Sequence, residues 1–105
     1  MAVGHENLVK LTLIQLSKIP LTRAWANHTG VARSMDGKRI IRYGLVGSAD
    51  VLGISNGRFI AAEIKIGKDK QRAEQIAFQK MIETNGGLYF LIRSEDDIKK
   101  MVAML

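Results

Sequence analysis

The feature that most constrains this chain is the pair Asn56-Gly57, which lies between two apolar segments in the stretch 47–67, GSADVLGISNGRFIAAEIKIG. Asn-Gly strongly favours a two-residue type I′ turn between antiparallel strands. With these residues as the turn, Ser55 lies opposite Arg58, and the pairing of the whole hairpin is fixed. The sequence therefore predicts both a hairpin and its register.

This register brings charged side chains together inside an apolar hairpin. It places Asp50 directly opposite Glu63, on one face of the sheet, with Cβ atoms about 4.5–5.5 Å apart. Lys65 is two residues beyond Glu63 and shares that face. A bulge at Gly53 would shift the pairing. Two opposed carboxylates between apolar neighbours repel each other and destabilise the sheet, so their presence needs a reason.

A divalent cation between Asp50 and Glu63 would remove this repulsion. Oxygen ligands suit Mg²⁺ or Mn²⁺, which prefer carboxylates and waters. Such an ion activates water and neutralises charge on a phosphate, while Lys65 can hold that water or phosphate as a point charge. The spacing indicates a metal-dependent phosphodiesterase site. The alternative is a structural pair of Glu63 and Lys65 at the edge of the sheet, with Asp50 in solvent.

The rest of the chain is typical of helices and strands packed around this hairpin. Val9, Leu13 and Leu16 recur at helical spacing, which predicts a helix from 5 to about 18, ended by Pro20. The segment 24–30 suits a short strand that runs into a turn. Further along, the sequence predicts a turn at Asp36-Gly37, a strand over 39–47, a helix over 68–84 ended by Asn85-Gly86-Gly87, a buried strand over 88–93 and a last helix from a capping box at 94–97 to about 104. The order α-β-β-β-α-β-α predicts one α/β domain over 1–105, with a small mixed sheet flanked by helices.

Several of these segments resemble a nuclease family. Asp50 followed by Glu63-Ile64-Lys65 resembles the PD-(D/E)XK nuclease signature, in which an acid and E-x-K lie on a hairpin. More narrowly, GSADVLG, EIKIG, EQIAFQ and NGGLYFLIRS are similar to the virus-type replication-repair nuclease (VRR-NUC) domain, from about Gly44 to Ser94. The resemblance implies a restriction-endonuclease-like core. Ala49 stands where the nominal motif has proline, a position that needs no side-chain chemistry.

The resemblance also implies roles for individual residues. It implies a set of metal ligands: Glu6, Asp50, Glu63 and the main-chain carbonyl of Ile64. It implies a catalytic set as well: Asp50, Glu63, Lys65 and Gln75. From the residues themselves, Gln75 shares a helical stripe with Phe78 and Ile82, so its amide should face inward. Glu6 shares the stripe of Val9, and the alternative for it is an ordinary first-turn acid favoured by the helix dipole.

Positive charge is concentrated in the middle of the chain. Residues 23–80 contain eleven Lys or Arg and five acids, whereas the remainder is neutral and the whole chain carries +6. A confined surplus of this kind favours a polyanion partner, most simply nucleic acid, although a solvated basic surface would look the same. The candidate phosphate-binding residues form two groups: Arg33, Lys38, Arg39 and Arg42, then Lys68, Lys70 and Arg72.

Together these features predict a Mg²⁺- or Mn²⁺-dependent DNA endonuclease that uses water directly. The resemblance implies a Holliday-junction resolvase, and two symmetric nicks favour a homodimer. The alternatives are a flap or RNA nuclease, and a nucleic-acid-binding module with a structural acid cluster. The chain has no cysteine and no apolar segment long enough to span a membrane, which fits a reducing cell interior. The resemblance to stand-alone family members implies the cytoplasm of a bacterium or a phage-infected cell. We expect His5 and His28 to be surface histidines and Trp25 to lie in the core.

Overall fold

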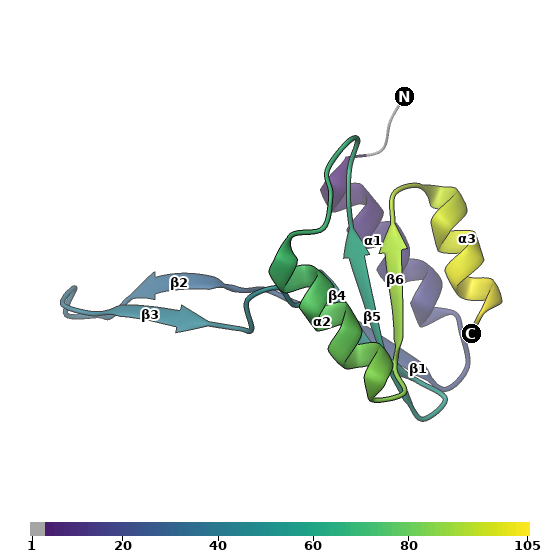
Figure 1. Cartoon of the computed structure of the whole chain (residues 1–105), viewed down its shortest axis with the longest axis horizontal. Coiled ribbons are helices and arrows are strands. Elements are labelled where there is room, and N and C mark those ends of the chain that lie inside the picture. The colour runs from purple at the N-terminus through teal and green to yellow at the C-terminus, as the bar shows by residue number, and fades with distance from the viewer. Residues whose placement is uncertain (1–3) are drawn as a thin grey trace.

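The computed structural model describes residues 4–105, which form a three-layer α/β domain with one projecting hairpin (Figure 1). The main sheet has the strand order β1-β4-β5-β6, in which β5 and β6 are parallel and the other neighbours antiparallel. The elements in chain order are α1 (His5–Ser17), β1 (Thr22–Ala26), β2 (Gly30–Arg33), β3 (Ile40–Tyr43), β4 (Val51–Ser55), β5 (Arg58–Ile64), α2 (Ala73–Thr84), β6 (Leu88–Ile92) and α3 (Glu95–Ala103). The predicted α/β fold is confirmed.

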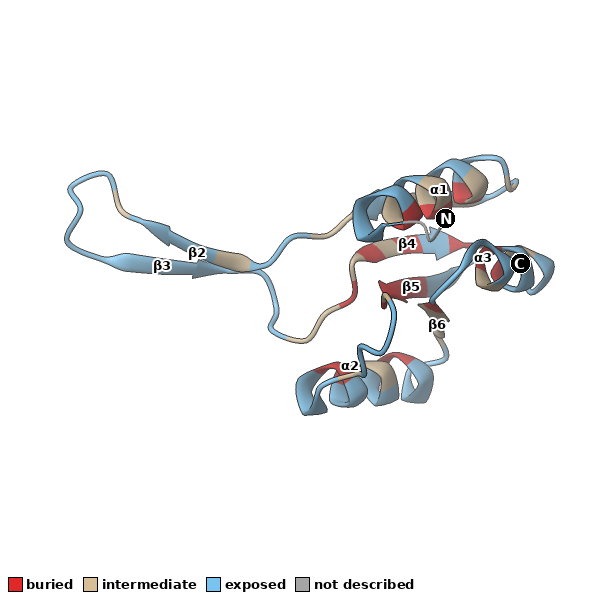
Figure 2. Cartoon of the chain, turned by 90° about the horizontal axis from the view of Figure 1, so that it is seen from above, coloured by how far each residue is buried: buried red, intermediate tan, exposed pale blue. Residues whose placement is uncertain are grey.

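Helices cover both faces of the main sheet. Helices α1 and α3 pack against one face and against each other, whereas α2 packs on the opposite face over β5 and β6 (Figure 2). The larger core lies under α1 and α3 and contains Leu8, Ile60, Ile92 and Met101. None of the helices in residues 4–105 is both long and apolar enough to cross a membrane.

The central hairpin has the register that the Asn-Gly pair predicts. Asn56 and Gly57 both have positive φ, 48° and 84°, as a type I′ turn requires. Ser55 pairs with Arg58, and the pairing continues without a bulge at Gly53 to Val51 opposite Ala62. Strand β5 lies between β4 and β6, so it is an inner strand of the sheet.

The first helix is confirmed, but its buried face differs from the predicted one. The residues that α1 buries are Leu8, Thr12 and Leu16, and Glu6 is exposed to solvent. Val9 and Leu13 are only partly buried at the margin of the core. The prediction that Glu6 points toward the core was therefore wrong, because the polar Thr12 lies on the buried stripe.

The second helix begins later than predicted, at Ala73 and not at 68. Gly67 has φ +62° and forms a turn with Lys68, and the following residues up to Arg72 are not helical. Gln75 then accepts a hydrogen bond from the Arg72 main-chain N–H at 2.8 Å, which ends the extended segment and starts the helix. The bounds of α1, β6 and α3 and the end of α2 agree with the predicted ones within a residue or two.

The segment between α1 and the central hairpin contains more strands than predicted. Strand β1, which pairs with β4 at the edge of the main sheet, overlaps the short strand predicted in 24–30, whereas β2 was not predicted. Strands β2 and β3 pair only with each other and project from the body as a two-stranded arm (Figures 1 and 2). Trp25 on β1 is 46% exposed, so the prediction of a core tryptophan was wrong.

Candidate metal centre at the end of the central hairpin

The structure brings Asp50 and Glu63 together at one end of β4 and β5. Asp50 immediately precedes β4, and its Oδ2 accepts a hydrogen bond from the main-chain N–H of Ile64 at 2.8 Å. Glu63 is the next to last residue of β5 and is only 4% exposed. The ion pair of Glu63 and Lys65 that the structural alternative expects is present at 4.0 Å, but it is buried and, because β5 is an inner strand, it does not lie at the edge of the sheet.

Glu63 has only one of its two carboxylate oxygens in contact with protein donors. Gln75 donates from Nε2 to Oε1 at 3.2 Å, and the Lys65 ammonium is 4.0 Å from the same oxygen. Oε2 is buried and has no hydrogen-bond partner among the described residues. Burial, and then the charge of Asp50, raise the pKa of Glu63 to about 8 against an ordinary value of 4.5. A buried carboxylate in this state needs either a proton or a cation.

The pocket around these side chains suits a hard divalent cation. It has a volume of about 480 Å³, and Asp50, Glu63, Ile64, Lys65 and Gln75 all line it. The two acids offer carboxylate oxygens as metal ligands, including the Glu63 Oε2 that has no hydrogen bond, and Mg²⁺ and Mn²⁺ prefer such oxygen ligands. In residues 4–105 no three His, Asp or Glu side chains converge closely enough to hold an ion on their own. A cation here would therefore take two carboxylates, with the Ile64 carbonyl and waters as further ligands.

The first helix contributes His5 to this site, and not the predicted Glu6. His5 Nε2 is 3.4 Å from Asp50 Oδ2, and His5 lines the pocket. Glu6 lines a neighbouring cavity of about 470 Å³, which also contacts His5, His28 and Asp50. His5 and His28 are both exposed, as predicted, but His5 also contacts Asp50, because the first turn of α1 lies beside that acid.

The position of Asp50 is fixed by hydrogen bonds from the end of β1. The Asn27 side chain donates to Ser48 Oγ at 2.8 Å and to the Ala49 carbonyl at 2.9 Å. The Asn27 main-chain N–H donates to the Asp50 carbonyl at 2.8 Å. Three bonds from one residue thus hold the loop that carries the acid.

The loop before Asp50 also packs tightly on the start of α2. Gly47 has φ +87°, and a Cβ there would lie 2.5 Å from the Glu74 carbonyl oxygen. A side chain at this position would push the loop away from α2. Glu74 and Asp69 also line the pocket, and the sequence analysis did not identify either acid as part of the site. Asp69 lies among basic residues in the loop after β5, and the pattern there indicated phosphate binding only.

The two basic groups lie in different places. Arg72 lines the pocket, and its charge acts on Glu63. Lys68 and Lys70 are exposed in the adjoining loop. The members of the other group are all exposed and lie on the arm, outside the pocket: Arg33, Lys38, Arg39 and Arg42. The pocket reaches the arm at the segments that join the arm to the body, where Thr29 and Val46 line the pocket.

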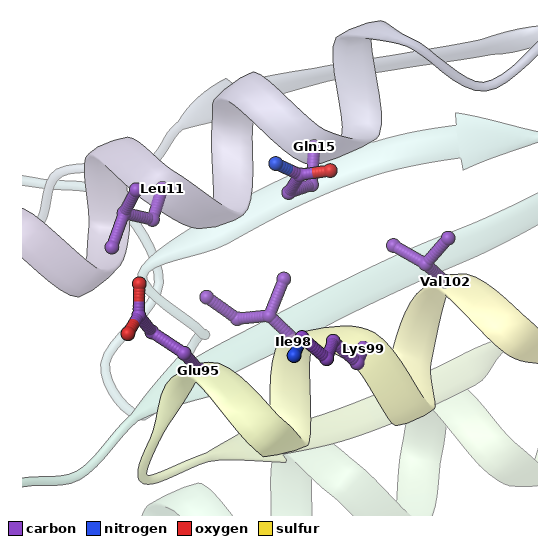
Figure 3. A pocket seen from close by; sticks show the side chains of 6 residues that line it. All are labelled: Leu11, Gln15, Glu95, Ile98, Lys99 and Val102. Carbon is purple, nitrogen blue, oxygen red and sulfur yellow. The ribbon is translucent and has the colours of Figure 1, made fainter.

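A smaller apolar groove on the other side of the sheet lacks this chemistry. It has a volume of about 250 Å³ and lies between Leu11 and Gln15 of α1 and the side chains of α3 (Figure 3). Glu95 is the only acid that lines it. The pair of acids therefore distinguishes the pocket at the end of the hairpin from the groove between α1 and α3.

Comparison of the sequence with models of known protein families and with curated proteins finds no match.

Proposed function

We propose that this protein is a metal-dependent nuclease that hydrolyses phosphodiester bonds in DNA, with Asp50 and Glu63 as the metal-binding acids. The observation that carries the proposal is the unpartnered, buried Oε2 of Glu63 beside a second carboxylate, in a pocket that also holds a lysine. Burying a carboxylate such as that of Glu63 costs several kcal/mol unless its charge is compensated, and buried polar atoms are normally hydrogen-bonded. The resemblance to VRR-NUC nucleases supports the same assignment.

The contacts of six pocket residues support specific roles in this reaction. Asp50, Glu63 and the Ile64 carbonyl would hold Mg²⁺ or Mn²⁺, which supplies an activated water and neutralises charge on the scissile phosphate. Gln75 fixes the Glu63 carboxylate through its 3.2 Å hydrogen bond. Lys65, only 8% exposed, offers a positive charge to the attacking water or to a phosphate oxygen. Arg72 at the rim is placed to bind a neighbouring phosphate.

The proposed substrate is branched DNA, a four-way junction, which a homodimer would cut twice. This part rests on the resemblance to stand-alone VRR-NUC nucleases and on the symmetry of the junction. The exposed basic arm supports DNA binding by backbone contacts and shape. A flap nuclease and an RNA nuclease are the neighbouring alternatives, and the bacterial or phage-infected cytoplasm is the proposed place of action.

Cleavage assays on four substrates test the proposal. Labelled four-way junction, flap, linear duplex and single-stranded DNA are incubated with Mg²⁺, Mn²⁺ or EDTA. We expect cation-dependent cleavage, with symmetric nicks in the junction. Glu63→Gln should abolish it, whereas Glu74→Gln, which changes another carboxyl on the same pocket, should retain it. DNA binding without cleavage of any substrate would instead identify a binding module with a structural acid pair.

A further inference from the structure

The arm has two chemically different faces. In an antiparallel ribbon, directly opposed residues share a face, and the faces alternate along each strand. The pairs Val31 with Arg42 and Arg33 with Ile40 therefore lie on one face, which carries two arginines. Within the strands, the opposite face carries Gly30, Tyr43, Ala32 and Ile41, and the Tyr43 hydroxyl is its one hydrogen-bonding side-chain group. The next pair toward the tip is Ser34 with Arg39, joined by a bond from the Ser34 N–H to the Arg39 carbonyl, and it continues this face with one arginine. We call the second one the apolar face of the arm.

This apolar face packs on no other element in residues 4–105. Ile41 and Tyr43 are each 48% exposed, and β2 and β3 pack extensively only against each other. The arm points away from the body, so it does not fold back onto its own sheet (Figures 1 and 2). An isolated two-stranded hairpin is at best marginally stable in water, and exposed apolar strands are an aggregation hazard. A surface of this kind is expected to be covered.

The body has a second uncovered apolar surface. Helix α2 packs over β5 and β6 and leaves the same face of β4 and β1 open. An apolar cavity of about 410 Å³ lies at this border, with Leu45, Leu52, Phe59 and Met81 in its lining. Beside it on the open face are Trp25, paired with Leu52, and Ile54, paired with Phe59. We call this surface, formed by these six residues, the open half-sheet.

We propose that the apolar face of the arm packs on the open half-sheet of a second copy of this chain, in a reciprocal two-fold dimer. Each copy supplies both surfaces, so the exchange closes on itself and leaves neither exposed. Nucleic acid is a poorer occupant of the apolar face than of the other face, because its one arginine, Arg39, lies at the tip, whereas Arg33 and Arg42 lie within the strands of the other face. The arm's other face, with Arg33 and Arg42, would remain outside in this dimer.

The exposed apolar side chains supply a substantial part of the area that a dimer needs. Trp25, Phe59 and Tyr43 are 46%, 39% and 48% exposed. Because aromatic side chains bury about 150–250 Å² each, these three expose roughly 200–330 Å² per copy. A standard interface takes about 800 Å² from each partner. Further area comes from the half-exposed Ile41, Leu45, Ile54 and Met81, at 48%, 57%, 51% and 45%.

The role of this dimer rests on the proposed nuclease function, but the contact itself does not. Two copies would present two acid pockets and two basic arm faces to one DNA molecule, which suits paired nicks. The molecular mass and the cross-linking between copies are measured without DNA or a cation. These experiments can therefore contradict the dimer contact without contradicting the proposed nuclease function, and cleavage assays can do the reverse.

The first test compares two neighbouring isoleucines on opposite faces of the arm. Wild-type protein should have about twice the 11.6 kDa chain mass by light scattering at tens of micromolar concentration. Ile41→Arg, on the apolar face, should be a monomer, whereas Ile40→Arg, on the basic face, should remain a dimer. Both positions are exposed, at 48% and 65%, so both variants should fold, which circular dichroism checks. A monomeric wild type, or an Ile41→Arg variant that is still a dimer, overturns the proposal.

The second test locates the contact. The chain has no cysteine, so single engineered thiols report only on the chosen pair. Ile41→Cys protein mixed with Ile54→Cys protein should form a disulfide-linked heterodimer under mild oxidation. The matched mixture of Ile40→Cys and Ile54→Cys should link much more slowly. Equal rates for the two mixtures would refute the docking of the apolar face. Protection of the Ile41→Cys thiol by duplex DNA alone would assign that face to nucleic acid and equally refute it.

Discussion

Replacing Glu63 by glutamine should make the stability of the metal-free protein much less sensitive to pH. Burial and Asp50 raise the pKa of Glu63 to about 8, so the folded protein retains a proton that the unfolded chain releases above about pH 4.5. The stabilising contribution of this proton is complete below pH 4.5 and is lost as the pH rises to 8. Glutamine keeps the shape of the protonated acid and does not titrate.

The expected effect is large for a domain of this size. A pKa difference between 4.5 and about 8 corresponds to roughly 5 kcal/mol at about 1.4 kcal/mol per pKa unit, and roughly 3 kcal/mol of it is already lost at pH 7. Most domains have a total unfolding free energy of about 5–15 kcal/mol. Relative to wild type, Glu63→Gln should therefore gain about 3 kcal/mol between pH 4 and pH 7.

Urea denaturation in EDTA, followed by circular dichroism at fixed protein concentration, measures this difference. Other titrating groups are common to both proteins and cancel in the comparison. The control is Glu74→Gln, an exposed carboxyl on the same pocket, which should not reproduce the pH-dependent gain. A stability difference between wild type and Glu63→Gln that is equal at pH 4 and pH 7 would show that Glu63 is not a strained buried acid.

Three further outcomes are expected. Mg²⁺ should raise the melting temperature of wild type and do less for Asp50→Asn, because ligand binding to the folded state stabilises it; equal shifts would place the ion elsewhere. Lys65→Ala should lose cleavage by a factor of 10² or more yet keep the Mg²⁺-dependent melting shift, since it serves the reaction and not the metal. Joint replacement of Lys68, Lys70 and Arg72 should weaken DNA binding for all sequences and make the affinity less dependent on salt concentration. An unchanged salt dependence would mean that these residues face only solvent.

The part of the site that lies on the hairpin was predictable because short-range chemistry fixes it. The Asn56-Gly57 turn sets the register over the whole of β4 and β5, so the meeting of Asp50 with Glu63 follows from sequence alone. Gln75 followed from helical periodicity, since Phe78 and Ile82 anchor the same stripe. Neither inference needed any knowledge of how distant segments pack.

The contribution of α1 was not predictable in the same way. Periodicity finds a helix, but the rotation of that helix about its axis depends on which stripe packs on the sheet. One residue corresponds to about 100° of rotation, which is enough to replace Glu6 by His5 at the pocket. The buried Thr12 concealed the true stripe, because a polar residue there carries no hydrophobic signal. The rotation of α1 about its axis is set by how the helix packs on β1.

The arm misled the sequence interpretation for a different physical reason. Ile40 and Ile41 are typical of a buried strand, yet both are exposed, because the rule that apolar residues are buried assumes that the single chain supplies the cover. Glu63 breaks the corresponding rule for polar groups, since its Oε2 is buried without a donor. These two exceptions differ in kind. The first is unmet apolar area, which a second protein surface can cover, and the second is unmet charge, which a cation can neutralise. Residues 4–105 leave both unmet, and the proposed cation and the proposed second copy would each meet one of them.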